Sequence, residues 1–139
     1  MIELADTGAW AKQHALPAER RGAFATQVDR GAVVTCDAVK AELLYSTRNV
    51  DHFRARRTYL EALPCCPIRA QEWGRAFDVY ELLAARGGAH HREVPFNDLL
   101  IAAAAEAAGV PVLHYDRHFE RIAEVTGQPV RAIAPLGSL

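Results

Sequence analysis

Short apolar runs alternate with amphipathic stretches along the whole chain, and this alternation limits the folds that it can adopt. Four runs have the length and composition of strands; they are residues 2–5, 32–36, 111–115 and 129–133. Strands that alternate with helices of this length are joined by right-handed crossovers and form a mainly parallel sheet. The sequence therefore predicts an α/β fold, a three-layer α/β/α sandwich whose sheet has four to five strands.

Turn and capping residues mark the helices between these strands. The predicted helices are residues 7–15, 17–30, 38–47, 51–63, 70–86, 98–108 and 117–125. Asp37, Asp51 and Asn97 are the expected N-caps of three of them, because Asp and Asn side chains accept hydrogen bonds from first-turn N–H groups. In residues 70–86, the aromatic residue Trp73 begins a stripe at helical spacing, which indicates a face in the core or against another copy of the chain.

The composition is that of one globular domain spanning residues 1–139. Half of the residues are hydrophobic and 24% are charged, which argues against disorder. The formal net charge of −1 excludes nucleic-acid binding driven by bulk charge, so such a role needs a local basic patch. The chain has no run of about 18 apolar residues and no secretory signal, and we expect no membrane partner.

Three cysteines, Cys36, Cys65 and Cys66, form neither a zinc-binding spacing nor a disulfide framework. A reduced, cytoplasmic location is therefore expected. Cys65 and Cys66 stand between Pro64 and Pro67, and this short bracketed run is predicted to be an edge strand.

Four carboxylates stand where strands end or helices begin. Asp6 and Asp116 directly follow predicted strands, Glu42 lies about one turn into a helix, and Asp98 begins another. Each position alone is typical of a helix cap or a first helical turn. In parallel α/β folds, however, ligand sites lie beyond the carboxyl ends of the strands, near a topological switch point. We therefore expect the four side chains to converge on one edge of the sheet.

Such a convergence has an electrostatic cost that indicates a cation. Four carboxylates within about 4–7 Å of one another repel by several kcal/mol at an effective dielectric constant near 20. We therefore expect that at least one of them has a raised pKa, or that a divalent cation binds among them. Hard oxygen ligands suit Mg²⁺ or Mn²⁺, and an acidic site of this kind most often acts on phosphate esters.

Four segments resemble the motifs of PIN domains and, more narrowly, those of VapC-type toxins, the ribonuclease half of bacterial toxin–antitoxin pairs. They are residues 2–8 (IELADTG), 41–46 (AELLYS), 97–104 (NDLLIAAA) and 112–119 (VLHYDRHF). The motifs occur in order, and the resemblance covers essentially the whole chain. It implies a PIN-like nuclease domain in which four residues form an acidic quartet that holds Mg²⁺ or Mn²⁺; these are Asp6, Glu42, Asp98 and Asp116.

The resemblance also implies roles within the quartet and a biological function. Asp6 and Asp98 would bind the metal directly, Glu42 and Asp116 would act through water or serve a second metal, and Thr7 would orient the site through its hydroxyl. The implied activity is that of a metal-dependent endoribonuclease toxin that cleaves structured cellular RNA such as tRNA or rRNA. The implied partners are a small antitoxin protein and a second copy of the chain in a homodimer.

Two positions depart from the family pattern. Gly8 stands where a serine is common, which removes one possible hydroxyl contact. His118 stands where a second acid is frequent, which lowers the local negative charge and puts a fifth acidic ligand in doubt. His114 and His118 invite an acid–base mechanism, but His114 lies inside a predicted strand and is expected to pack or hydrogen-bond locally.

Several alternatives remain open from the sequence. The chain could be a catalytically silent PIN-like module that binds RNA or protein, or a Mg²⁺-dependent phosphatase acting on small molecules. Two groups of arginines are either solvated helix faces or phosphate-binding groups, because the guanidinium fork matches phosphate oxygens. They are Arg48, Arg54, Arg56 and Arg57 in one group, and Arg117 and Arg121 in the other.

Overall fold

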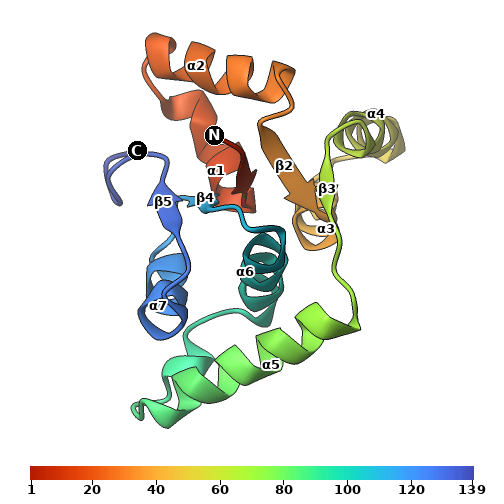
Figure 1. Cartoon of the computed structure of the whole chain (residues 1–139). Helices are drawn as coiled ribbons and strands as arrows, with labels where there is room; N and C mark the ends of the chain where they lie inside the picture. The colour runs from red at the N-terminus through yellow and green to blue at the C-terminus, as the bar shows by residue number, and fades with distance from the viewer.

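Five parallel strands form the central sheet of the computed structural model, which describes residues 1–139 (Figure 1). The strands are β1 (Glu3–Ala5), β2 (Val33–Cys36), β3 (Cys65–Cys66), β4 (Val112–His114) and β5 (Val130–Ala132). Their order across the sheet is β3-β2-β1-β4-β5, and every neighbouring pair is parallel. The predicted parallel α/β sandwich is therefore confirmed, and Cys65–Cys66 is the expected edge strand.

Seven α-helices cover this sheet. They are α1 (Thr7–Lys12), α2 (Ala18–Asp29), α3 (Asp37–Tyr45), α4 (Val50–Glu61), α5 (Ala70–Ala85), α6 (Phe96–Ala108) and α7 (Arg117–Thr126), with short 3₁₀ helices at Gln13–Ala15 and His90–Arg92. Helices α1 and α2 lie on one face of the sheet, and α6 and α7 lie on the other (Figure 1). Helix α5 packs on α6 from outside, and none of the helices is long and apolar enough to cross a membrane.

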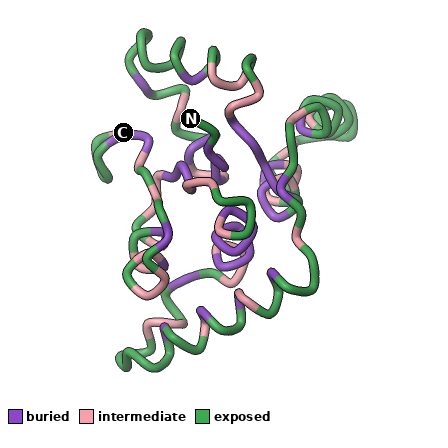
Figure 2. The backbone as a smooth tube through the Cα atoms, in the orientation of Figure 1, coloured by how far each residue is buried: buried purple, intermediate pink, exposed green.

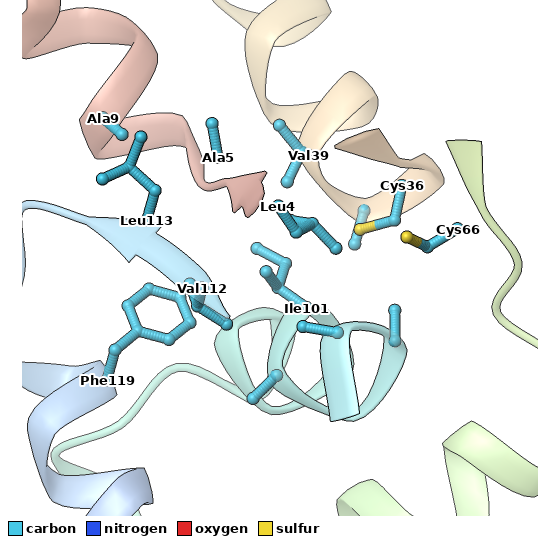
Figure 3. Packing of buried hydrophobic residues seen from close by; sticks show 14 of the residues in the cluster. Leu4, Ala5, Ala9, Cys36, Val39, Cys66, Ile101, Val112, Leu113 and Phe119 are labelled. Carbon is cyan, nitrogen blue, oxygen red and sulfur yellow. The ribbon is translucent and has the colours of Figure 1, made fainter. Parts of the chain in front are cut away.

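The three inner strands are buried on both faces. Every residue of β1, β2 and β4 is buried, as expected for parallel strands covered by helices on either side (Figure 2). Figure 3 shows Leu113 of β4 near Ala9 of α1, while Val112 points toward Ile101 of α6 and Phe119 of α7. Helix α6 is buried from residue 99 to residue 105, and its run of small alanines allows the close approach of its neighbours.

The strand order places a topological switch point between β1 and β4. From β1 the chain moves outward through β2 to β3, then returns past β1 to form β4 on its other side. The carboxyl ends of β1 and β4 are thus adjacent, with Leu4 beside Val112 and Ala5 beside Leu113. A site at this edge receives side chains from both halves of the chain.

Three details of the predicted helices are wrong. Asn49, not Asp51, caps α4, because its side chain accepts a hydrogen bond of 2.9 Å from the His52 N–H. Cys36 occupies the N-cap position of α3, so Asp37 lies in its first turn. Asn97 also lies inside its helix, because Pro95 occupies the N-cap position of α6 and frees the Asn97 amide for a tertiary contact.

The aromatic stripe of α5 does not face the core. The buried residues of this helix lie one position earlier, at Glu72, Ala76, Val79 and Leu83. Trp73 and Phe77 remain 46% and 57% exposed and contact Phe96, with ring-centroid distances of 5.8 and 4.9 Å. The side chains that α5 places against α6 include the small residues Ala76 and Val79, which permit close approach of the two helices. The larger rings of Trp73 and Phe77 therefore lie at the edge of this helix–helix contact.

Candidate active site

The four predicted acidic residues come from four different helices around the switch point. Asp6 is the N-cap of α1 directly after β1, and Asp116 is the N-cap of α7 shortly after β4. Asp98 lies in the first turn of α6, and Glu42 lies within α3. The charges of Asp98 and Asp116 act on Asp6, and those of Glu42 and Asp116 act on Asp98. Repulsion between like charges thus links Asp6 with Asp98 and Asp116, and Asp98 with Glu42, at this edge of the sheet. We call these four residues the acidic group.

Asp6 is the most deeply buried of the four, with 5% of its surface exposed. Its Oδ1 accepts a hydrogen bond of 2.8 Å from the Ala9 N–H, which caps α1. Burial raises the pKa of Asp6 to about 7, and the negative charges of Asp98 and Asp116 add to this effect against the backbone hydrogen bonds. The expected rise in pKa is confirmed, but burial contributes more to it than repulsion between carboxylates.

His118 connects Asp98 and Asp116. Its Nδ1 lies 3.1 Å from Asp98 Oδ2 and 3.2 Å from Asp116 Oδ1, and its backbone N–H donates to Asp116 Oδ1 over 2.9 Å. Burial raises the pKa of Asp98 to about 6, although the hydrogen bond and charge of His118 oppose the rise. The His118 ring nitrogen thus lies close to two carboxylates, at a position where an acidic side chain would repel them.

Glu42 is held by two donors from other helices. The Thr7 hydroxyl donates to Glu42 Oε1 over 3.1 Å, and the Asn97 amide donates to the same oxygen over 2.6 Å. Asn97 also donates to the Ala38 carbonyl over 3.2 Å, which ties α6 to α3. Sequence reasoning assigned Asn97 only a capping role, and its place directly before Asp98 in the NDLLIAAA motif was the available signal for a second one.

His114 is a structural residue. Its side chain is fully buried, its Nδ1 accepts from the Asp116 N–H over 3.1 Å, and its Nε2 lies 3.0 Å from Glu120 Oε1. An accepting Nδ1 leaves the proton on Nε2, where it bonds to Glu120. Burial lowers the pKa of His114, which favours this neutral form. The expectation that His114 bonds locally is confirmed, and the ring is not free to act in a histidine pair.

The type of donor atom at the site suits a hard divalent cation, although the spacing of the side chains does not form a metal site. No lysine or arginine forms an ion pair with any of the four acids, and His118 is the single basic group that contacts them. No three His, Cys, Asp or Glu side chains of the structure are placed so that they could hold a metal ion together. Buried carboxylates with raised pKa values favour either protons or a nearby cation, and carboxylate oxygens are the ligands that Mg²⁺ and Mn²⁺ prefer.

Gly8 leaves room for a side chain beside Asp6. A Cβ atom there would lie 3.5 and 3.6 Å from the Asp6 carboxylate oxygens and 3.7 Å from the Tyr115 nitrogen, which are ordinary contacts. We expect Gly8→Ala to stabilise α1 by roughly 0.5 kcal/mol through helix propensity. Gly8→Ser should have a free energy of unfolding about 1 kcal/mol higher than that of Gly8→Ala at pH 8, because the serine hydroxyl can donate a hydrogen bond to the ionised Asp6.

Thermal melts at pH 8 in EDTA check this order, in which wild type melts lowest and Gly8→Ser highest. One kcal/mol corresponds to roughly 3–5 °C in a chain of this size. A Gly8→Ser variant that melts no higher than Gly8→Ala would show that the hydroxyl does not reach the carboxylate.

Known proteins with similar sequences and structures identify the family of this chain. A family model described as PIN domain matches residues 4–125. Ribonuclease VapC18 of Mycobacterium tuberculosis is 39% identical over 139 residues, which is 100% of both chains. Ribonuclease VapC51 of the same organism is 40% identical over 128 residues, covering 92% of this chain and 90% of the relative.

Solved structures show the same fold at lower identity. The crystal structure of DNA-bound VapBC from Salmonella typhimurium matches with a TM-score of 0.73 at 19% identity, covering 96% of this chain and 100% of that chain. VapBC-1 from nontypeable Haemophilus influenzae matches with a TM-score of 0.71 at 18% identity, over 96% of this chain and 98% of that chain. With the family model and the two ribonucleases, these observations give one conclusion: the chain belongs to the PIN domain family and, within it, to the VapC ribonucleases.

Proposed function

We propose that residues 1–139 act as a single nuclease domain, an endoribonuclease toxin that requires Mg²⁺ or Mn²⁺ and cleaves structured cellular RNA such as tRNA or rRNA. The observation that carries the proposal is the coupling of four carboxylates from four helices at the switch point, with no lysine or arginine to neutralise them. Membership of the VapC ribonucleases supports RNA as the substrate class.

In this proposal Asp6 and Asp98 hold the cation, and Glu42 and Asp116 act through bound water or serve a second metal. The cation would supply Lewis-acid stabilisation of the phosphodiester and of the leaving oxygen. The reaction is in-line attack of water on the phosphodiester, which leaves a 5′-phosphate and a 3′-hydroxyl because the 2′-hydroxyl is not the nucleophile.

The surrounding side chains keep the carboxylates oriented. His118 donates to Asp98 Oδ2, while Thr7 and Asn97 both donate to Glu42 Oε1. The Ala9 N–H fixes Asp6 Oδ1. These contacts lower the entropy that the acidic groups lose when they bind a ligand, which is the usual role of groups around a metal site.

The proposal includes two protein partners. The VapBC crystal structures that the chain resembles, and a structure of a toxin–antitoxin complex from Klebsiella pneumoniae with a TM-score of 0.66, support a small antitoxin that neutralises the nuclease. The exposed rings of Trp73 and Phe77 on α5 offer an apolar surface for the expected homodimer.

Cleavage of total cellular RNA by the purified chain tests the proposed reaction. We expect discrete products with 5′-phosphate ends in Mg²⁺ or Mn²⁺, no cleavage in EDTA, and continued cleavage when the scissile nucleotide carries a 2′-O-methyl group. Asp98→Asn should lower the rate at least about 100-fold, as the loss of a group that supports metal binding does. The matched control is Asp51→Asn, the same change at an exposed position in α4.

Four outcomes would contradict this reaction. Full activity in EDTA, or products with 2′,3′-cyclic phosphates, would exclude attack by water at a metal-dependent site. RNA binding in EDTA without any cleavage in Mg²⁺ would indicate a catalytically silent module. Hydrolysis of a simple aryl phosphate, with RNA left intact, would indicate a phosphatase.

A further inference from the structure

A polar hollow of about 320 Å³ lies at the start of α7, beside the acidic group. Glu93, Arg117, His118 and Arg121 line it, and no hydrophobic residue does. We call it the arginine pocket. Its walls come from the first two turns of α7 and from the loop that follows the 3₁₀ helix His90–Arg92, so two separate segments build it.

The arginine pocket adjoins the candidate active site through His118. The His118 ring lines the pocket while its Nδ1 contacts Asp98 and Asp116, at 3.1 and 3.2 Å. Arg117 also borders a second, more open hollow of about 560 Å³ that includes Asp116. The phosphate backbone of a nucleic acid that lies across the acidic residues would therefore pass Arg117 next to Asp116.

The charges of the pocket suit an anion. Arg117 is exposed and forms no ion pair. Arg121 forms an ion pair of 2.8 Å with Glu93, and both side chains remain partly exposed, at 31% and 48%. The guanidinium fork matches phosphate oxygens, and the N-terminal turn of α7 adds a further positive potential. Glu93 is thus a built-in competitor for Arg121 that a phosphate can displace.

We propose that the arginine pocket binds a phosphate of the RNA strand next to the phosphate that is cleaved. This inference rests on the proposed ribonuclease function and names the groups that bring a polyanion to an acidic site. The four carboxylates repel RNA, and the net charge of −1 offers no general attraction, so local cations are needed at this edge. Arg117 binds the phosphate directly, and Arg121 joins it once Glu93 is displaced.

The test measures the binding of a fluorescein-labelled 12-nucleotide single-stranded RNA of mixed sequence to the full chain in EDTA. We expect Arg117→Gln to weaken binding about tenfold, because a hydrogen-bonded charge pair is lost. It should also reduce the slope of log Kd against log salt concentration by about 0.7. Glu93→Gln should tighten binding several-fold, since it frees Arg121. The control Arg86→Gln, at an exposed arginine that pairs with Glu124 and belongs to neither predicted phosphate-binding group, should change Kd less than about twofold.

Cleavage kinetics in Mg²⁺ separate this inference from the proposed function. Arg117→Gln should raise KM more than it lowers kcat, which indicates lost binding rather than lost chemistry. Cleavage by wild type, with Kd and KM unchanged in Arg117→Gln and Glu93→Gln, would overturn the pocket and leave the ribonuclease intact. Arginine-dependent RNA binding without cleavage by wild type would support the pocket and contradict the ribonuclease. Unchanged RNA binding in Arg117→Gln and Glu93→Gln would contradict the proposal and indicate that the pocket binds an acidic segment of a protein partner instead.

Discussion

Asp6→Asn is expected to stabilise the chain in EDTA, by about 4 kcal/mol at pH 8 and about 1.5 kcal/mol at pH 5. The pKa of Asp6 is raised from 3.8 to about 7 in the fold, so its ionisation costs folding free energy. The unfolded chain releases this proton from about pH 4, whereas the folded chain keeps it until about pH 7. Stability therefore falls as the pH rises through this window, and asparagine removes the loss while it still caps α1.

Urea unfolding at the two pH values measures this effect. Asp116→Asn is the matched control, because it makes the same change at another N-cap where the side chain is 42% exposed, and its gain should be much smaller. Mg²⁺ at 100 times its dissociation constant should raise the free energy of unfolding of wild type by about 2.7 kcal/mol and that of Asp6→Asn only a little. The difference in stability between the two proteins should therefore become smaller. Equal stability of wild type and Asp6→Asn at pH 8 in EDTA would show that ionisation of the buried Asp6 does not destabilise the fold.

Arg131→Met is expected to destabilise the chain by about 3–5 kcal/mol, which lowers the melting temperature by roughly 10 °C or more. Glu3 on β1 is 1% exposed, and its two carboxylate oxygens accept hydrogen bonds of 2.8 and 2.7 Å from Arg131 on β5. The guanidinium crosses β4 to reach it, on the face where Ala5, Leu113 and Arg131 stand in register. Without Arg131 the buried carboxylate has no partner.

The double variant Glu3→Gln/Arg131→Met separates the lost partner from lost packing. It should recover most of the stability, because a neutral amide is much less costly to bury than an unpaired charge. Arg86→Met is the control, since Arg86 pairs with the 56%-exposed Glu124 and its loss should cost less than about 1 kcal/mol. A double variant as unstable as Arg131→Met would mean that packing of the arginine, not pairing of the charge, stabilises this face.

The sequence alone predicts the order of the strands and helices and the place of the acidic residues. These properties depend on local signals: β-branched runs, helical periodicity and Asp residues that cap helices directly after strands. Because the strands are parallel, residues after β1 and β4 must meet at one edge of the sheet. Asp6 and Asp116 are therefore assigned to the same site from their positions in the chain.

The tertiary structure decides which side chains contact one another there. Asn97 reaches Glu42 across 55 positions, and His118 reaches Asp98 across 20. Helix α5 buries Ala76 and leaves Trp73 exposed because of the surface that α6 presents, which periodicity cannot specify. The raised pKa of Asp6 likewise depends mainly on its burial by packed helices. Local sequence signals therefore show which acidic residues follow strands or begin helices. The distances between these residues and their burial depend on how segments remote in the sequence pack together, which only the tertiary structure decides.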